Sequence, residues 1–520
     1  MNDKVVLLFP PNWTACVAGP HLAMPLLAGV AKTISWQVES WDLSELFYRT
    51  YATPPSHSLV TEAVRGNDFR TLDRIYFGWE DQLRSSSTSF GCSNFGLLSG
   101  YPFDEMRFLP LARVEEMTRE GTVYSEFLDH VVNRLAAVKP QAIGVTVASR
   151  EQVIPAIQLL REIRTKLPES FLILGGNILT RLRRTSAFQV FKSLVDQTVL
   201  FQGELAFANT LSTIRAHGVE RARKALPKIT SDEFIHYESW PVPHFSGIAF
   251  NHMIGTPTLT YVSTRGCYWG KCHFCAIPAG WSTKGYGGSA PAEFVADQLV
   301  DMTQETGIPR IKFVDEAVPP SKVVPLSRRL CALGANVEWE GYARLEPAWE
   351  DLDLLEEAHA GGLRKLYFGL EQAPNTNRLI LGKNDRGNPM QILRACYQVG
   401  IKVHLFCMVG HPGSSCTDAE ATVRFLVDNE LLIDTADLVG FRLDRGTNVP
   451  GVRPVQEDCD WSMSLKYEPT QDGVLSNEAV NDLELSCQEE LWETVPRLLH
   501  PLYRIVGSWD TSYMPPNPPS

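Results

Sequence analysis

The first half of the chain alternates short apolar runs with segments of helical periodicity. Residues 5–9 form a continuous apolar run that ends at two prolines, and a helical pattern follows over residues 21–32. Further strand candidates are residues 37–41, 142–148, 171–174 and 198–201, with a helical pattern over residues 151–166. Continuous apolar runs are typical of parallel strands that are buried on both faces. The alternation therefore predicts a doubly wound, Rossmann-like α/β domain over residues 1–225.

A second alternation follows residues 226–257, which contain three prolines, lack periodicity and are predicted to be a linker. Residues 258–445 hold six strand candidates, each followed by a segment of helix length. They lie at residues 258–263, 310–315, 337–343, 365–370, 402–409 and 437–443. Six such units predict a partial (β/α)6 barrel with its chemistry at the carboxyl ends of the strands.

Two regions give weaker patterns. Residues 50–125 are rich in Ser, Phe, Gly and Pro and predict irregular structure. Residues 446–520 predict a mostly helical C-terminal segment because a helical pattern covers residues 477–498.

Composition and charge narrow the function classes. The 520 residues are 44% hydrophobic and 21% charged, which is typical of globular proteins. The net charge of −12 disfavours a nucleic-acid partner, because such proteins usually carry a basic excess. The N-terminus lacks the features of a signal peptide, and no apolar run is long enough to span a membrane. We therefore expect a soluble, cytoplasmic protein with neither a nucleic-acid nor a membrane partner.

Three of the eleven cysteines lie close together. Cys267, Cys272 and Cys275 fall within nine residues, directly after the first strand of the second alternation. Thiolates are the ligands of iron–sulfur clusters, and three of them leave one iron of a four-iron cluster open for chemistry. A structural zinc site would need a fourth ligand, for which His273 is poorly placed. A redox pair of Cys272 and Cys275 would leave Cys267 unexplained. Zinc, the redox pair and accidental clustering stay open as alternatives.

The cysteine run resembles the signature of the radical S-adenosylmethionine (SAM) superfamily. That signature spaces its cysteines as Cys-x3-Cys-x2-Cys with an aromatic residue before the third, and Phe274 fills this place. The first gap here is one residue longer than usual. The resemblance implies a [4Fe-4S] cluster on the three cysteines and SAM as its partner.

Other strand ends resemble this superfamily too. The run Phe368-Gly369-Leu370-Glu371 resembles one whose Glu contacts SAM, which implies this role for Glu371. The run from Met408 to Gly413 resembles a turn beside the adenine, which implies contacts from Gly410 and Pro412. Charged residues at two further strand ends are expected to meet the amino and carboxylate groups of SAM, namely Asp315, Glu316 and Arg344. Solvated strand-end charge is the alternative for each, and His404 and His411 are expected to be structural.

An α/β domain before such a barrel resembles the cobalamin-binding radical SAM enzymes, over roughly residues 1–430. The resemblance implies that cobalamin contacts Pro10, Asn12, Gly175, Gly176, Gly203 and Glu204. The Asp-x-His-x-x-Gly motif that ligates cobalt in many cobalamin proteins is absent, and His21 does not fit it. Base-off cobalamin without a His ligand from that motif is therefore implied. A domain that has lost cobalamin is the alternative.

The resemblance implies a cobalamin-dependent C-methyltransferase. One SAM would recharge cobalamin with a methyl group, and a second would yield the radical that activates a carbon of the substrate. The expected substrate is a natural-product intermediate, as in antibiotic biosynthesis, presented as a small molecule, on a carrier or as a peptide. An external donor such as flavodoxin or ferredoxin would supply electrons. A radical cyclase or rearrangement enzyme is the main alternative, while a transfer-RNA methylthiotransferase and a non-catalytic sensor are disfavoured. Candidate pocket aromatics are Trp79, Tyr101, Phe103, Trp461 and Trp492.

Overall fold

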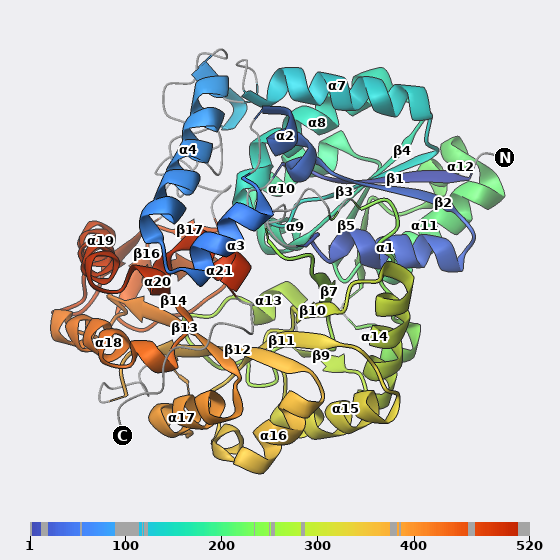
Figure 1. The fold of residues 1–520 in the computed structure, drawn as a ribbon. Coiled ribbons are helices and arrows are strands. Elements are labelled where there is room, and N and C mark those ends of the chain that lie inside the picture. Colours follow the sequence, from blue (N-terminus) through green and yellow to red (C-terminus); the bar gives the residue numbers. More distant parts are fainter. Residues whose placement is uncertain are drawn as a thin grey trace.

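Two six-stranded parallel sheets, one in each half of the chain, organise the molecule (Figure 1). The computed structural model describes residues 3–11, 19–51, 55–88, 114–116, 118, 123–232, 234–248, 250, 255–281, 286–374, 382–383, 386–455 and 463–507. Three of the candidate pocket aromatics, Tyr101, Phe103 and Trp461, lie outside these residues. Trp79 lies within helix α4 (Phe69–Thr88), but its side chain is not described. The α/β class and the order of the two domains agree with the expectation from the sequence.

The first sheet has the strand order β2-β1-β3-β4-β5-β6. Its strands are β1 (Lys4–Phe9), β2 (Gln37–Asp42), β3 (Ala142–Thr146), β4 (Phe171–Gly175), β5 (Gln197–Phe201) and β6 (Ile229–Asp232). The order reverses between β1 and β3, and in doubly wound sheets ligands bind beyond the carboxyl ends of the strands near such a switch point. The main helices of this domain are α1 (Ala23–Thr33), α2 (Leu43–Tyr51), α7 (Val123–Val138), α8 (Val153–Lys166), α9 (Asn177–Leu182), α10 (Ser186–Leu194), α11 (Glu204–His217) and α12 (Val219–Ala225).

The second sheet has the order β7-β10-β11-β12-β13-β14 and is an open, partial barrel. Its strands are β7 (Leu259–Tyr261), β10 (Arg310–Phe313), β11 (Glu338–Ala343), β12 (Leu363–Glu371), β13 (Lys402–Val409) and β14 (Thr435–Gly440). The helices between them are α14 (Ala292–Thr306), α15 (Pro320–Ala332), α16 (Leu352–Ala360), α17 (Pro389–Val399) and α18 (Cys416–Asp428). All six strands thus direct their carboxyl ends to one edge.

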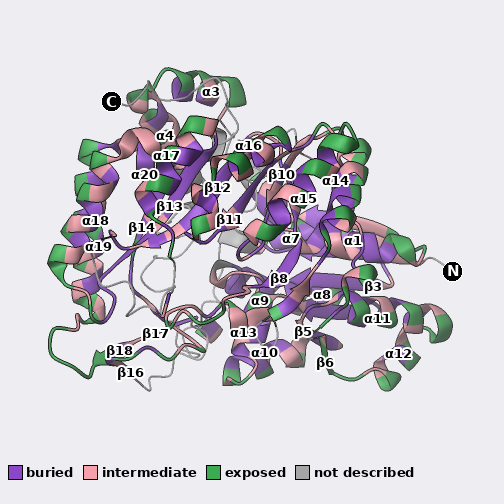
Figure 2. Ribbon diagram, turned by 90° about the horizontal axis from the view of Figure 1, so that it is seen from below, coloured by how far each residue is buried: buried purple, intermediate pink, exposed green. Residues whose placement is uncertain are grey.

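The buried residues follow the two sheets. Figure 2 shows the strands of both sheets mostly buried, while the surrounding helices expose their outer faces. Each sheet has its own large apolar core, one built around Val6 and Ile143 and the other around Ile311 and Leu366. Burial on both faces explains why the strands are readable as continuous apolar runs.

Two segments differ from the expectation. Part of the region predicted to be irregular forms helices α3 (His57–Arg65) and α4 (Phe69–Thr88), and α3 buries Val60 and Val64. Strand β6 lies inside the predicted linker; its burial pattern shows no fully buried residue, as expected of an edge strand. The exact domain boundaries stay predictions.

The C-terminal segment connects the two domains. It follows β15 (Leu443–Asp444) and contains the short strands β16 (Val452–Pro454), β17 (Ser464–Leu465) and β18 (Tyr467–Pro469). It ends with helices α19 (Asn477–Thr494), α20 (Pro496–Leu499) and α21 (Pro501–Gly507). Helix α19 packs on the second domain through Leu491, whereas Leu502 and Tyr503 of α21 belong to the core of the first. This segment therefore helps to hold the two domains together (Figure 1).

Candidate functional site

The three cysteines lie in a loop at the carboxyl edge of the second sheet. The loop follows strand β8 (Thr264–Gly266), which pairs with β9 (Tyr286–Ser289), and it ends at the short helix α13 (Pro278–Trp281). Gly266 and Gly270 have positive φ angles of 84° and 61°, which L side chains rarely adopt. A turn in which the Cys275 amide donates to the Cys272 carbonyl, at 3.2 Å, closes the loop.

The long first gap of the cysteine run is filled by an anchored tryptophan. The Trp269 indole donates to the Gly382 carbonyl at 3.1 Å. Two cations lie near its ring, with the Arg344 guanidinium 4.7 Å and the Lys271 ammonium 5.0 Å from the ring centroid. Cation–π contacts of this kind hold the extra residue in one place. The unusual spacing is therefore built into a fixed loop.

The cysteine thiols are partly buried, and burial raises the pKa of Cys272 to about 11 and that of Cys275 to about 12. Metal ligation requires thiolates, so these sulfurs need a strong cationic centre to lose their protons. Across the part of the chain that the structure describes, no three His, Cys, Asp or Glu side chains converge closely enough to hold one metal ion. Each of the three thiolates would bind a different iron of a four-iron cluster.

Glu371 lies at the end of β12, close to the cysteine loop. Its φ of 63° is unusual for a residue other than glycine, and a bulge interrupts the strand pairing at this position. The Lys383 ammonium contacts Glu371 Oε1 at 2.8 Å and the Gly369 carbonyl at 2.5 Å. A Cβ atom at residue 369 would lie 2.4 Å from the Lys383 nitrogen, so a larger residue there would displace the end of the Lys383 side chain. Strained backbone of this kind is often found at functional sites.

The other charged candidates lie around the cysteine loop in different roles. Arg344 stacks on Trp269, and its Nε lies 3.1 Å from Glu346 Oε1. Asp315 is buried, and its carboxylate accepts from the Ser263 amide and hydroxyl, with the hydroxyl at 2.7 Å from Oδ1. Through these contacts Asp315 stabilises the connection between β7 and β8. Arg344 stabilises the cysteine loop through Trp269.

Glu316 lines the cavity at the carboxyl ends of β3, β4 and β5, which is described below. The Trp281 indole donates to Glu316 Oε1 at 2.8 Å, and burial raises the pKa of this carboxyl to about 7.

A cavity of about 480 Å³ lies between the two domains, and we call it the interdomain cavity. The first domain contributes the loop after β3 and helix α9. The second contributes Phe274, Glu371 and the ends of β13 and β14. Its charged lining residues are Arg150, Arg181, Glu371, Asp437, Arg442 and Asp444. The cavity thus brings two predicted site residues, Phe274 and Glu371, against the strand ends of the first domain.

A second cavity, of about 370 Å³, lies at the carboxyl ends of β3, β4 and β5, and we call it the strand-end cavity. Four residues predicted to contact cobalamin line it, namely Gly175, Gly176, Gly203 and Glu204. Gly176 has a φ of 119°, and a Cβ there would lie 2.1 Å from the Val147 carbonyl oxygen. Only glycine allows the backbone to pass this point.

The lining of the strand-end cavity combines apolar and polar side chains, which suits a ligand with an apolar body and polar groups at its edge, as cobalamin has. Leu26, Ile173 and Val199 supply apolar surface. Arg265 Nε is buried without a hydrogen-bond partner among the described residues, and Arg265 lines this cavity. A buried donor without an acceptor is costly, so an acceptor on a ligand would be stabilising there.

His21 also lines the strand-end cavity, just before α1. Its ring stacks on Phe9 with centroids 4.9 Å apart, and burial lowers its pKa to about 4. The Ala23 amide donates to His21 Nδ1 at 3.3 Å, so in the neutral ring Nε2 carries the proton.

The remaining candidates lie elsewhere. The Pro10 carbonyl accepts from Gln152 Nε2 at 2.7 Å and Asn12 lies outside the described residues. Gly410 packs on Val480 of α19, and Gly410 and Pro412 do not line the interdomain cavity. Burial lowers the pKa of His404 to about 3 and that of His411 to about 4, in keeping with structural roles. Trp492 stacks on His500 and lines neither cavity.

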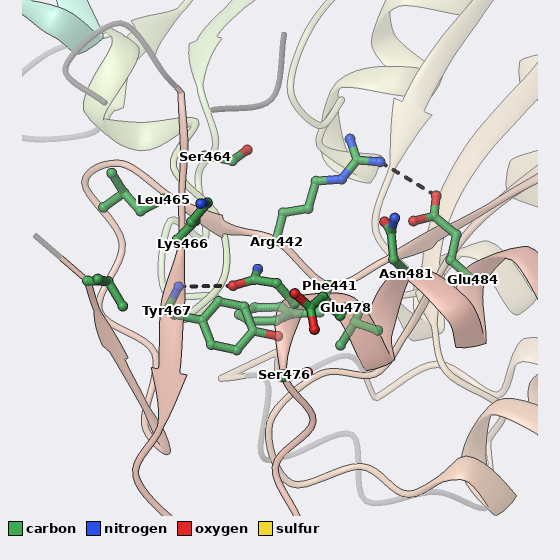
Figure 3. Close-up of a pocket in the computed structure, with 13 residues that line it drawn as sticks. Phe441, Arg442, Ser464, Leu465, Lys466, Tyr467, Ser476, Glu478, Asn481 and Glu484 are labelled. Carbon is green, nitrogen blue, oxygen red and sulfur yellow. Dashed lines mark hydrogen bonds and ion pairs between the residues drawn. The ribbon is translucent and has the colours of Figure 1, made fainter. Parts of the chain in front are cut away.

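A third pocket, of about 400 Å³, is built by the C-terminal segment, and Figure 3 shows its lining. We call it the C-terminal pocket. Phe441 and Tyr467 form an aromatic side, and Glu478, Asn481 and Glu484 of α19 form a polar one. Arg442 and Ser464 line both this pocket and the interdomain cavity. Arg442 contacts Glu484 at 3.5 Å, so this ion pair stands at the boundary between the two spaces.

Residues 261–426 match the family model of the Radical SAM superfamily. The matched stretch runs from β7 into α18 and contains all three cysteines and Glu371. The chain carries a radical SAM domain. No curated protein sequence matches this chain.

Among the solved structures that match, two proteins share the fold over nearly the whole chain. TsrM from Kitasatospora setae, a radical SAM methyltransferase solved with cobalamin and a [4Fe-4S] cluster, is 14% identical, with a TM-score of 0.59. The match covers 96% of this chain and 91% of TsrM. OxsB, a cobalamin-dependent SAM radical enzyme solved with aqua-cobalamin, is also 14% identical, with a TM-score of 0.54. This match covers 98% of this chain and 58% of OxsB. The α/β domain before the radical SAM domain is therefore arranged as in both.

Several site residues could not be recognised from the sequence. Lys383, Arg265 and Gln202 reach the site through contacts between distant parts of the chain. Arg181 and Arg442 lie in segments without any motif.

Proposed function

We propose that this radical SAM enzyme is a cobalamin-dependent C-methyltransferase that acts on a carbon of a natural-product intermediate. One observation carries the proposal. The interdomain cavity and the strand-end cavity share three lining residues, Ala148, Asn177 and Arg181. A substrate in the first cavity would therefore lie beside a ligand in the second.

The residues present support particular cofactor positions. Cys267, Cys272 and Cys275 would hold a [4Fe-4S] cluster, and the strand-end cavity would hold cobalamin. Bound there, the cluster supplies the electron that cleaves SAM and cobalamin supplies a methyl group for transfer. Glu371 offers a carboxylate beside the cysteine loop for the ammonium group of SAM, because a desolvated cation needs an opposite charge.

The chain itself would orient the substrate and exclude water. The interdomain cavity lies between two domains joined by the C-terminal segment, and reactive intermediates are protected where water is excluded. Its charged lining favours a polar substrate that carries ionised groups. A structure of the similar TsrM contains tryptophan as substrate, which supports a small molecule. The C-terminal pocket, reached past Arg442, could hold a distal part of such a substrate.

The proposal also includes a reducing setting with an external electron donor such as flavodoxin or ferredoxin. Among the described residues no disulfide joins two cysteines, in keeping with such a setting. No helix in the described part of the chain has the length and apolarity needed to cross a bilayer.

The experiment uses anaerobically reconstituted protein incubated with hydroxocobalamin and then desalted. Methyl transfer predicts retained corrinoid absorption. With dithionite, SAM and extracts that contain candidate substrates, it predicts both S-adenosylhomocysteine and 5′-deoxyadenosine. A radical cyclase or rearrangement enzyme would use the same cofactors but would form no S-adenosylhomocysteine. Loss of all corrinoid on desalting contradicts both the methyltransferase and the cobalamin-dependent cyclase or rearrangement enzyme.

A matched control separates the cofactor sites. Cys331 is an exposed cysteine of the second domain outside the cysteine loop. The Cys331→Ala variant should keep both products, whereas the Cys272→Ala variant should lose 5′-deoxyadenosine and retain corrinoid.

A further inference from the structure

The side chain of Arg265 leaves its own domain and enters the first. Arg265 lies two residues before Cys267 and is 1% exposed. Its Nη1 donates to Gln202 Oε1 at 2.6 Å, and its Nη2 lies 2.5 Å from Glu204 Oε1. The guanidinium also stacks on Trp240, 4.4 Å from the ring centroid. The residue beside the cysteine loop is thus held by three side chains that precede the second domain.

Two of the three partners of Arg265, Gln202 and Glu204, line the strand-end cavity. Gln202 and Gly203 connect β5 to α11, Glu204 is the first residue of α11, and all three line the cavity together with Arg265. Glu204 Oε2 accepts from the Gly203 amide at 3.0 Å, which fixes the carboxylate in its own loop. One ion pair therefore connects the cavity wall with the strand that leads into the cysteine loop.

The connection is rigid because it is buried and tightly packed. A Cβ at Gly287 of β9 would lie 3.1 Å from Gln202 Nε2 and 3.2 Å from the Arg265 Cβ. Glu204 is 3% exposed, so removing Arg265 would leave a buried carboxylate without its partner. The loop and the start of the cysteine run cannot shift independently without breaking this pair.

We propose that Arg265 is a positioning residue that couples ligand binding in the strand-end cavity to the conformation of the cysteine loop. The inference rests on the proposed function, since the ligand is cobalamin and the loop holds the cluster. A ligand shifts an equilibrium only if it contacts the two states differently. Arg265 Nε has no hydrogen-bond partner among the described residues and supplies a contact that an acceptor in the cavity would satisfy. Coupling of this kind is reciprocal, so cluster and corrinoid favour each other's binding.

The test compares the Kd of hydroxocobalamin for cluster-free and cluster-loaded protein, followed by corrinoid absorbance. The wild-type protein should bind it about fivefold or more tightly once the cluster is loaded. The Glu204→Gln variant should bring this ratio close to one, because the amide keeps the shape and loses the charge. The double variant Glu204→Met with Arg265→Met removes both charges, which proteins often tolerate, and should give the same ratio.

Glu305→Gln is the matched control. Glu305 pairs with Lys32 and His244 across the same two domains, far from the cysteine run in sequence and outside the strand-end cavity wall. This variant should keep the wild-type ratio. A wild-type ratio of one, or an unchanged ratio in the Glu204→Gln and double variants, overturns the coupling while leaving the proposed function intact. Absence of any hydroxocobalamin binding by the wild-type protein overturns the proposed function and the coupling with it.

Discussion

Gly176 and Gly218 share one backbone conformation in different surroundings. Their φ angles are 119° and 77°, with ψ near 162° for both. A Cβ at residue 176 would lie 2.1 Å from the Val147 carbonyl oxygen, whereas at residue 218 no atom lies within 4 Å. Gly218→Ala should therefore cost about 1–3 kcal/mol of backbone strain, and Gly176→Ala more.

Urea unfolding measures the stability difference between the two alanine variants, and desalting measures retained corrinoid. Gly176→Ala should lose corrinoid and Gly218→Ala should keep it. Equal costs for the two substitutions would show that the close approach at Gly176 does not shape the cavity.

Glu371 is the residue that we expect to recognise the ammonium group of SAM. Glu371→Gln should weaken SAM binding by roughly 10- to 100-fold, because a charged hydrogen bond contributes about 1.5–3 kcal/mol. Equilibrium dialysis with cluster-loaded protein measures the affinity. Glu357→Gln, which breaks an exposed ion pair with Arg328, is the control and should bind SAM normally. Unchanged affinity in Glu371→Gln would exclude this role.

Individual site residues could be predicted from the sequence where they stand in a short motif. Phe274 and Glu371 stand in short motifs, and both line the interdomain cavity. Arg265 and Lys383 could not be predicted from the sequence. Their ion-pair partners, Glu204 and Glu371, are 61 and 12 residues away, and no local pattern encodes such contacts. Asp315 was predicted to meet SAM because it ends a strand. That role stays a prediction; its carboxylate also accepts from Ser263, a contact that only the fold brings about.

At the scale of elements, the predicted strands agree with the structure wherever both faces are buried. Strands β1, β3, β4, β12 and β13 consist mostly of apolar residues and appear as such in the sequence. Strand β6 has the sequence Ile-Thr-Ser-Asp at a sheet edge, so its pattern lacks an apolar run. Helices α3 and α4 lie in a region whose composition favours loops, and their apolar positions are packed by α21, far away in the sequence.

Strand β13 carries a histidine whose burial predicts acid sensitivity. The His404 Nδ1 lies 2.8 Å from the Thr435 hydroxyl oxygen, and burial lowers its pKa to about 3. Between this value and the ordinary pKa near 6.5, the unfolded chain binds a proton that the folded chain does not. Stability should therefore fall as pH drops below about 6.5, by up to about 1.4 kcal/mol per pH unit.

Urea unfolding at pH 7 and pH 5 tests this contribution. The wild-type protein should lose up to about 2 kcal/mol more than His404→Asn over this range. His57→Asn changes an exposed histidine and should behave like the wild type. Equal losses in the wild type and His404→Asn would contradict the buried, neutral state of His404.

At the scale of the whole molecule, the two sheets place their carboxyl ends around shared space. Ala148, Asn177 and Arg181 line both cavities, and Arg265 reaches from the second domain to the loop after β5. Helix α21 returns to the first domain and packs against α3 and α4 (Figure 1). The sequence predicted two domains in this order, but the packing of one on the other depends on residues outside every motif.

The central claim is that Cys267, Cys272 and Cys275 hold a cluster that cleaves SAM. The most direct measurement is 5′-deoxyadenosine formed from SAM by anaerobically reconstituted protein, with dithionite as reductant and chromatography as readout. The wild-type protein should form it only when dithionite is present. A variant with all three cysteines changed to alanine should form none while the Cys331→Ala control matches the wild type. No dithionite-dependent 5′-deoxyadenosine from the wild type, or equal amounts from the triple variant, would contradict the claim.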